Sequence, residues 1–272
     1  MKTIPLDIPM LKIWLQEAWR RGDYAHFYPY MEPGAHEFLL RLDIAPGAKL
    51  LDVGCGGGHL ALLAAQAGAQ VTGIDIFPNL LEMARKRARA QGVSIQFDQG
   101  DVETLPYEND HFDVVLSLFS TMFAPRPERT TAEMLRITKP GGRLIMANWT
   151  PDGFVGRMAK VITRHYAAPP VMTSPWQWGE EASVRARLQG LRELRLTPRV
   201  YPLHFPFPPV EVVAFLRKYY GPLNRTFEEL DRVGCAALQT DLEQFWIDNN
   251  RSEKPDATHI EAAYLEVDGL KA

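Results

Sequence analysis

The stretch LLDVGCGGGHLALLAAQAGAQVTGIDI, from Leu50 to Ile76, decides the fold of this chain. An apolar run leads into four glycines between positions 54 and 58, and a helix-forming run and a second apolar run follow. Glycine between a strand and a helix lets the backbone turn tightly and approach a ligand closely. The stretch therefore predicts a strand, a glycine loop, a helix and a second strand, an arrangement that holds nucleotide cofactors of several chemical kinds.

Two details narrow the kind of cofactor. The dinucleotide-binding fingerprint has a third glycine where the loop enters the helix. When Gly54 and Gly56 are counted as the first two, that position is His59. Asp52 stands directly before the loop, where a carboxylate would repel a pyrophosphate and attract a cationic group. Both details favour a cofactor with a cationic group over a dinucleotide.

More polar residues follow the later strands. Asp75 closes the second strand, and a carboxylate there can accept hydrogen bonds from both hydroxyls of a ribose. Asp101 follows the third strand and could accept a hydrogen bond from the exocyclic amine of adenine. Ser117 and Phe119 reach the same edge in FDVVLSLFS. Ligands of open α/β sheets bind in the crevice outside the carboxyl ends of the strands, so these residues are predicted to meet there.

The rest of the chain continues the alternation of strands and helices. The predicted strands are KLLDV, QVTGIDI, SIQFDQG, FDVVLSL and GRLIMANW, with the helices HLALLAAQA, PNLLEMARKRARAQ and PERTTAEMLRIT between them. Such an alternation predicts a parallel sheet with right-handed crossovers. Residues 1–45 are predicted to be helical. After Trp149 the regular alternation of strands and helices stops. Residues 190–205 and 257–270 are predicted to complete the sheet. Residues 151–189 and 206–256 are predicted to be helical insertions.

Composition limits the classes of binding partner and the cellular compartment that we expect. The 272 residues are 46% hydrophobic, which suffices for a sizeable core. The net charge of −3 gives no electrostatic reason to expect a nucleic acid or an anionic membrane. The two cysteines, Cys55 and Cys235, are far apart and fit a reducing compartment. We see no signal peptide in MKTIPLDIPM and no apolar run near the roughly 20 residues that span a bilayer, so we expect a cytoplasmic protein.

Four segments in this order resemble one known family. They are LLDVGCGGGHL, GIDIFPNLLEMA, GDVETLPYENDHFDVVLSL and ITKPGGRLIMANW, and together they cover roughly residues 46–150. The resemblance is to class I S-adenosylmethionine-dependent methyltransferases, nearest to the ubiquinone and menaquinone biosynthesis branch. It implies a Rossmann-like, doubly wound, mostly parallel sheet with helical cap insertions. Residues 1–45 would form an N-terminal helical lid, 46–150 the cofactor-binding α/β core, and 151–272 the completion of the sheet with an inserted substrate cap.

The resemblance also implies roles for single residues. The loop of residues 54–58 would wrap the methionine moiety of S-adenosylmethionine, with Asp52 beneath it and the main chain of Ser117 facing the methionine end. Asp75 would hold the ribose hydroxyls, Asp101 the adenine amine, and the backbone at Val102 the ring nitrogen. The residues expected to bind the cofactor are Asp52, Gly54, Cys55, Gly56, Gly58, Asp75, Ile76, Asp101, Val102 and Ser117.

The methyl acceptor is predicted to be a small, largely apolar or aromatic metabolite. The loops FSTMFAP and NWTPDGF follow the fourth and fifth strands and would face the crevice. The residues predicted to line the acceptor pocket are Tyr24, Tyr28, Phe119, Met122, Phe123, Trp149 and Phe154. No catalytic residue is assigned; His165 and His204 are the only candidate bases. The histidines show no metal-ligand spacing, so no metal is expected.

Alternatives stay open at this point. The chain could be a cofactor-binding module without chemistry, or a nicotinamide-dependent oxidoreductase, against which His59 and Asp52 argue. The sequence determines neither the acceptor atom nor the oligomeric state. The N-terminal aromatic residues could pack on the flank of the sheet or close the crevice, and we favour the crevice. These residues are Trp14, Trp19, Tyr24, Phe27, Tyr28 and Tyr30.

Overall fold

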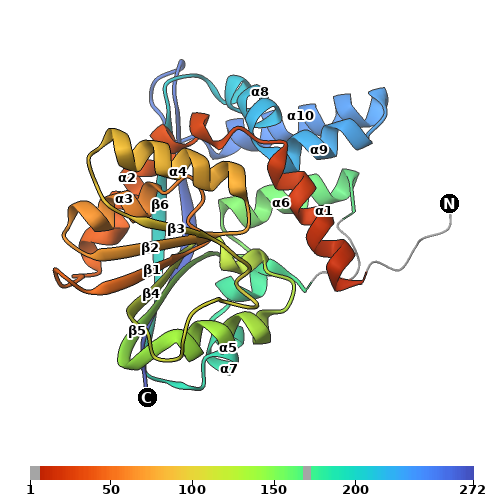
Figure 1. The fold of residues 1–272 in the computed structure, drawn as a ribbon. Coiled ribbons are helices and arrows are strands. Elements are labelled where there is room, and N and C mark those ends of the chain that lie inside the picture. The colour runs from red at the N-terminus through yellow and green to blue at the C-terminus, as the bar shows by residue number, and fades with distance from the viewer. Residues whose placement is uncertain (1–6, 168–172) are drawn as a thin grey trace.

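A seven-stranded sheet forms the centre of the molecule (Figure 1). The structure is a computed structural model that describes residues 7–167 and 173–272. The strands lie in the order β3-β2-β1-β4-β5-β7-β6. Their bounds are β1 (Lys49–Val53), β2 (Gln70–Asp75), β3 (Gln96–Gln99), β4 (Phe112–Leu118), β5 (Thr138–Trp149), β6 (Leu191–Phe205) and β7 (Thr258–Lys271).

The first five strands are parallel and the last two are antiparallel to their neighbours. β1 pairs with β2 and β4, β2 with β3, and β4 with β5, all in parallel. β7 pairs with β5 and with β6 in antiparallel register. Leu50 and Leu51 on β1 and Val115 on β4 are completely buried, as expected for a parallel sheet that is covered on both faces. The predicted Rossmann-like, mostly parallel α/β fold is confirmed.

Helices cover both faces of the sheet. α3 (His59–Gln66) and α4 (Pro78–Ala90) lie on one face, and α5 (Pro127–Ile137) and α7 (Glu181–Arg187) lie on the other (Figure 1). α4 begins with proline at its first position and carries Arg87 and Arg89 in its last turn, both favourable at those ends. This layering leaves the carboxyl ends of β1, β2 and β4 at one edge of the sheet.

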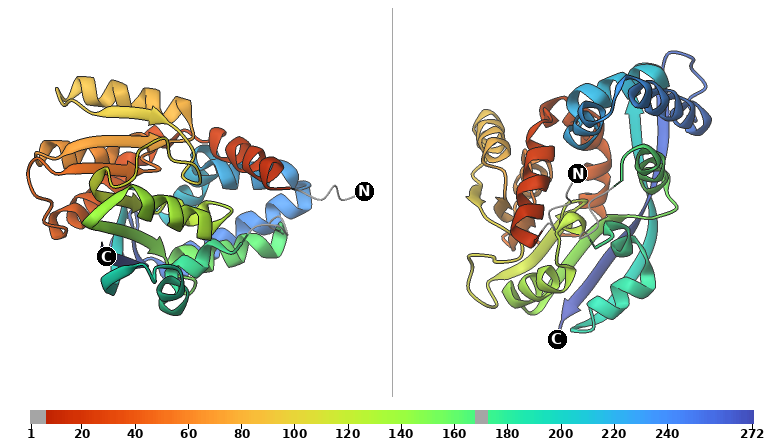
Figure 2. Two further views of the ribbon diagram at one scale, coloured as in Figure 1. Left: turned by 60° about the horizontal axis from the view of Figure 1, so that its bottom comes forward. Right: turned by 90° about the vertical axis from the view of Figure 1, so that its right-hand side faces the viewer.

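Further helices gather beside that edge. They are α6 (Phe154–His165), α8 (Pro209–Tyr219), α9 (Gly221–Glu229) and α10 (Arg232–Asn249). α10 packs on α6 and α8, and α1 (Ile8–Arg20) lies next to α9 (Figure 2). Short 3-10 turns connect the longer elements: η1 (Tyr24–His26), η2 (Thr121–Phe123) and η3 (Pro175–Gly179). In the described parts of the chain, none of the helices has the length and apolar character needed to cross a bilayer.

The two N-terminal helices are anchored differently. α2 (Tyr28–Arg41) contributes Ala35, Phe38 and Leu39 to the main hydrophobic core. α1 buries only Leu11 and Ala18 completely, and neither belongs to that core. α1 is therefore a surface helix on the edge of the sheet where the strands end.

Candidate active site

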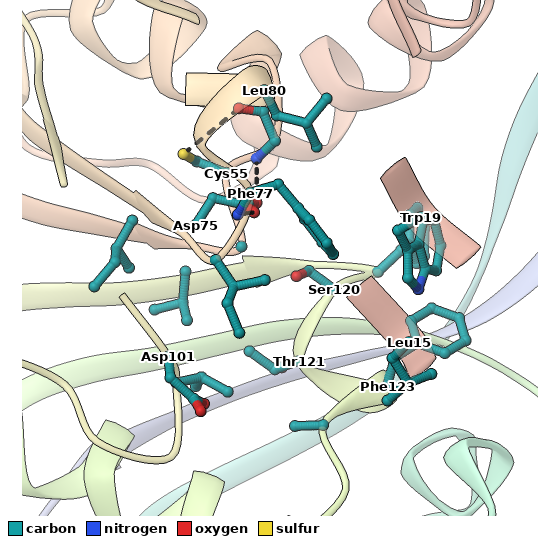
Figure 3. A pocket seen from close by; sticks show the side chains of 18 of the residues that line it. Leu15, Trp19, Cys55, Asp75, Phe77, Leu80, Asp101, Ser120, Thr121 and Phe123 are labelled. Atoms are coloured by element: carbon teal, nitrogen blue, oxygen red, sulfur yellow. Dashed lines mark hydrogen bonds between the residues drawn. The ribbon is translucent and has the colours of Figure 1, made fainter. Parts of the chain in front are cut away.

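A cavity of about 270 Å³ opens at the carboxyl ends of β1, β2 and β4, beneath α1. Figure 3 shows Asp75, Phe77 and Leu80 on one side of it and Trp19 and Phe123 on the other. Eleven of the seventeen residues predicted for the site line it: Tyr24, Tyr28, Gly54, Cys55, Gly56, Asp75, Ile76, Asp101, Val102, Phe119 and Phe123. Asp52, Gly58, Ser117, Met122, Trp149 and Phe154 lie outside the lining.

The glycine loop is packed too closely for any larger residue at two of its positions. The N–H of Gly54 donates to the carbonyl of Ile74 over 2.8 Å, which ties the loop to the end of β2. Gly54 has a φ of +70°, and a side chain there would collide with Ser120. The N–H of Gly57 donates to the Tyr28 hydroxyl over 2.6 Å, and a Cβ at Gly57 would strike that ring. The loop is thus held between β4 and the N-terminal segment.

Asp75 shapes the loop as well as facing the cavity. Its Oδ2 accepts from the N–H of Gly56 over 2.8 Å, and its Oδ1 accepts from the N–H of Phe77 over 2.9 Å. Burial raises the pKa of Asp75 to about 6, and the backbone hydrogen bonds partly oppose this rise. Each carboxylate oxygen has a second lone pair, so Asp75 can still accept a hydrogen bond from a ligand.

Asp52 lies behind the loop and does not line the cavity, because its side chain points into the interior. Burial first, and then the negative charge of Asp75, raise the pKa of Asp52 to about 7. Its Oδ2 has no hydrogen-bond partner among the residues that the structure describes. Two buried carboxyl groups close to the cavity favour a ligand that carries positive charge.

The burial of Asp52 predicts a pH-dependent effect on stability. Its pKa rises from 3.8 to about 7 on folding, so between these values the folded chain holds a proton that the unfolded chain has released. The stability contribution of Asp52 therefore falls as the pH rises through this window and stays low above it. We expect Asp52→Asn to raise the free energy of unfolding at pH 8 by on the order of 1–3 kcal/mol, and by much less at pH 5.

Thermal melting of the wild-type chain and of Asp52→Asn at pH 5 and pH 8 measures this difference. Asp152→Asn is the control, because the Asp152 side chain is 90% exposed and should give no such pH trend. If Asp52→Asn changes the melting temperature equally at pH 5 and pH 8, the carboxyl group does not carry the buried charge that we infer.

Asp101 faces the cavity between two partners. Its Oδ1 accepts from the N–H of Glu103 over 2.9 Å, and its Oδ2 lies 2.5 Å from the Nζ of Lys12. Lys12 belongs to α1 and also lines the cavity. An acidic residue was predicted at this edge, but its lysine partner was not.

The residues after β4 form one wall of the cavity. The Ser117 side chain is buried, and its Oγ accepts from the N–H of Thr121 over 3.2 Å, so this side chain holds the following turn. That the main chain of Ser117 faces the methionine end stays a prediction. Phe119, Ser120 and Thr121 line the cavity. Phe119 has a φ of +55°, a strained value for a residue with a side chain, and such strain clusters at functional sites.

Aromatic side chains surround the other end of the cavity. The ring of Trp19 lies 5.6 Å from that of Tyr24 and 5.5 Å from that of Phe123, measured between ring centres. Phe119 stacks on Trp149 at 3.5 Å between ring centres and also lines the cavity. The result is an apolar compartment next to the wall formed by β4.

Three residues predicted for this compartment are elsewhere. Met122 is buried in the core with 1% exposure. Trp149 lies behind Phe119, so it supports the wall without lining the cavity. Phe154 packs against Phe245, 4.9 Å away, and belongs to the contact between α6 and α10. All three side chains point into hydrophobic interiors that local sequence does not reveal.

The N-terminal aromatic residues divide between two surfaces. Trp19, Tyr24 and Tyr28 line the cavity. Phe27 and Tyr30 pack on the other side, against Phe215 of α8, with ring centres 4.9 and 5.6 Å away. The Trp14 ring lies under the guanidinium of Arg225 at 4.4 Å. The segment therefore contacts both the crevice and the helical cap.

The two candidate bases do not reach the cavity. His165 Nε2 pairs with Asp241 over 2.8 Å between α6 and α10. His204 stacks on His259 near the C-terminal end of β6, with ring centres 4.2 Å apart. His59 lines the cavity instead. Both of its ring nitrogens are buried and lack a hydrogen-bond partner within the described residues. Burial, with a smaller effect of Arg87, lowers the pKa of His59 to about 4, so the ring is neutral near pH 7.

Several lining residues were missed by the reasoning from sequence. Three of them, Lys12, Leu15 and Gln16, share one face of α1 with Trp19, which was expected to close the crevice. Their spacing of three, four and seven residues is that of one helical face, so this signal was present in the sequence. His59, Ser120 and Thr121 carried no comparable signal.

The geometry suits a nucleoside with a cationic group. The glycines of the loop, the carboxylates of Asp75 and Asp101 and the apolar side chains of Phe77 and Leu80 surround one end. The unpartnered His59 nitrogens belong to the lining and fit a hydrogen-bonding ligand nearby. Within residues 7–167 and 173–272, no three His, Cys, Asp or Glu side chains are placed to hold a metal ion.

Comparisons with known proteins agree with this chemistry. Residues 51–146 match the family described as "Methyltransferase domain". An uncharacterised protein of Mycobacterium tuberculosis (strain ATCC 25618 / H37Rv) is 33% identical over 230 residues, 82% of each chain. A ubiquinone biosynthesis O-methyltransferase of Xanthomonas oryzae pv. oryzae is 37% identical over 138 residues, 46% of this chain and 57% of that one. The YcgJ protein of Bacillus subtilis has a similar fold, with a TM-score of 0.57 and 18% identity over 87% of this chain and 97% of that one.

Proposed function

Because this chain belongs to the class I S-adenosylmethionine-dependent methyltransferases, we propose that it methylates a small, largely apolar or aromatic molecule bound beside Trp19 and Phe123. One observation carries the proposal: the cavity has a polar end at Asp75 and Asp101 and an aromatic end beneath α1, and the two ends are continuous. A cofactor and an apolar acceptor can therefore lie next to each other.

The polar end supports the cofactor roles within this proposal. Asp75 accepts hydrogen bonds from the ribose hydroxyls, Asp101 accepts one from the adenine amine, and the backbone of Val102 meets the adenine ring. Cys55 and Ile76 line the same end. Phe77 and Leu80 provide apolar contact for the base.

Asp52, Gly58 and Ser117 act indirectly in this proposal. The buried carboxyl group of Asp52 lies under the loop. Gly58, with a φ of +77°, starts α3, and Ser117 holds the turn after β4. These three residues shape the cofactor-binding end without touching the ligand.

The chain's own residues align the acceptor and exclude water. When bound, S-adenosylmethionine supplies an electrophilic methyl group. Trp19, Phe119 and Phe123 hold the acceptor ring in place, and α1 covers the cavity from the solvent side. Positioning of this kind can supply on the order of 7–11 kcal/mol of the barrier reduction. No proton acceptor is needed unless the acceptor atom must lose its proton early.

The same proposal includes the organisation of the chain. Residues 1–45 act as a lid, residues 46–150 bind the cofactor, and residues 151–272 complete the sheet and form the substrate cap. We keep a cytoplasmic location within the proposal, since Cys55 and Cys235 are both free thiols, as in a reducing compartment.

Radiolabelled S-adenosylmethionine tests the function directly. The purified chain is incubated with it and with a panel of small acceptors: phenols, aromatic amines, apolar carboxylic acids, polyamines and sugars. We expect label to enter the apolar or aromatic members and not the polyamines or sugars. Binding of S-adenosylhomocysteine in calorimetry without transfer to any acceptor, from the panel or from a metabolite extract, would support a non-catalytic binding module instead.

Phe123→Ala separates the acceptor end from the cofactor end. The variant removes one wall of the aromatic compartment, so we expect kcat/KM for an acceptor found in the panel to fall about 10- to 100-fold, since burying an aromatic side chain contributes roughly 1.5–3 kcal/mol. The affinity for S-adenosylhomocysteine should change less than about threefold.

Phe245→Ala is the matched control for this variant. Phe245 is also half-buried but contacts Phe154 on the far side of the cap. An equal loss of acceptor kcat/KM in both variants would count against the aromatic compartment as the acceptor site.

A further inference from the structure

Four charged side chains join α1 to the cofactor end of the cavity. The Lys12 cluster consists of Lys12, Asp101, Glu103 and Arg126. The Nζ of Lys12 lies 2.5 Å from Oδ2 of Asp101 and 2.5 Å from Oε2 of Glu103. Arg126 donates to the Glu103 carboxylate from its Nε over 2.8 Å and from its Nη2 over 2.6 Å. The cluster thus pairs two carboxylates with two cations.

Lys12 provides the second positive charge of the cluster, beside that of Arg126. The Glu103 side chain is completely buried, and Arg126 already neutralises it with a two-pronged contact. Asp101 is the second carboxylate, and Lys12 is the cation that reaches both acids. A buried carboxylate that loses its partner is strongly destabilised, so these ion pairs should hold their geometry.

Lys12 is also the point at which α1 is fastened to the cofactor end. It shares one face of α1 with Leu15, Gln16 and Trp19, and all four line the cavity. Trp19 lies seven residues further along, about 10 Å on a helix, which brings it to the aromatic end. α1 adds no residue to the main core; it is attached by its packing on α9, by the ring contacts of Trp19 with Phe123 and Tyr220, and by the ion pairs of Lys12.

We propose that Lys12 is a positioning residue that couples the cofactor end of the cavity to closure of α1 over the acceptor end. The inference rests on the proposed function, in which Asp101 binds the adenine amine. Asp101 can accept from the amine and from Lys12 at once, because each oxygen has two lone pairs. When the adenosine part of the cofactor is bound, Asp101 is ordered and holds Lys12. Lys12 in turn places Trp19 beside the acceptor. By linkage, closure of α1 strengthens cofactor binding to the same extent.

The first test is hydrogen exchange of the α1 amides with and without S-adenosylhomocysteine. In the wild-type chain the ligand should slow exchange over residues 8–20. In Lys12→Met, at saturating ligand, most of this extra protection should be lost. Lys12→Arg keeps the charge and should restore it. Lys160→Met is the matched control, since Lys160 pairs with the exposed Asp152.

The second test is a double-mutant cycle read by calorimetry with S-adenosylhomocysteine. Lys12→Met should weaken binding roughly 5- to 20-fold, within the usual range of coupling between sites. In combination with Asp101→Asn the two losses should be clearly less than additive, because both variants break one interaction. A merely structural loss of α1 stability would not produce this dependence on Asp101.

The outcomes separate the inference from the function on which it rests. If the wild-type chain binds no S-adenosylhomocysteine, the proposed function fails. If the wild-type chain binds it and Lys12→Met shows the same ligand-dependent protection of α1, or the cycle is additive, Lys12 does not couple the two ends. A failure of Lys12→Arg to restore protection would also overturn the inference, because charge would then not be the cause.

Discussion

Replacing Asp75 by alanine is expected to weaken the binding of S-adenosylhomocysteine by roughly 1–3 kcal/mol, or about 5- to 160-fold. In the proposed binding mode, the variant leaves the two ribose hydroxyls without an acceptor. It also removes the acceptor for the N–H groups of Gly56 and Phe77, which shape the glycine loop. Because both effects act on the same ligand, we expect a value near the upper end of this range.

Calorimetry of three variants gives the measurement and its control. Asp101→Ala should cost less than Asp75→Ala, because in the proposed binding mode the backbone near Val102 still contacts the adenine. Asp110→Ala serves as the control, since Asp110 pairs with Lys271 at the surface. Unchanged affinity in Asp75→Ala would contradict the ribose assignment. A complete loss in Asp101→Ala together with a small loss in Asp75→Ala would show that the two roles are reversed.

Removal of residues 1–22 is expected to leave a folded protein that transfers methyl groups at least about 100-fold more slowly. The deletion takes away α1, whose completely buried residues, Leu11 and Ala18, lie outside the main core. It also takes away Trp19 and the cover over the cavity, so the acceptor is no longer held and water enters. The cut stops before Phe27 and Tyr28, since these residues pack on α8 and on the glycine loop.

Circular dichroism and transfer of label measure the two parts of this prediction. A variant that lacks only residues 1–6 keeps all of α1 and is the control. If the longer deletion fails to fold, α1 is part of the structural core and not a cover. If it folds and transfers methyl groups at the wild-type rate, closure by α1 is not needed, and the aromatic residues of the segment serve another contact.

Local patterns in the sequence were sufficient for the sheet and for most of the cofactor end. The strands and helices between Lys49 and Trp149 follow from short apolar runs, glycine turns and a proline at the start of α4, each of which acts within a few residues. Asp75 and Asp101 were found because the carboxyl ends of parallel strands meet at one edge. The alternation therefore determined the parallel part of the sheet, the glycine loop and the edge where the predicted site residues meet.

Only the tertiary structure decided which side chains face the cavity. Lys12 contacts Asp101, which lies 89 positions further along the chain. No periodic pattern in the sequence predicts a contact between residues so far apart. Met122, Trp149 and Phe154 have the same apolar character as Phe119 and Phe123, yet they point into the interior. The hydrophobic character of a side chain predicts that it will be buried. The packing of distant elements decides whether it is buried in the core or against a ligand.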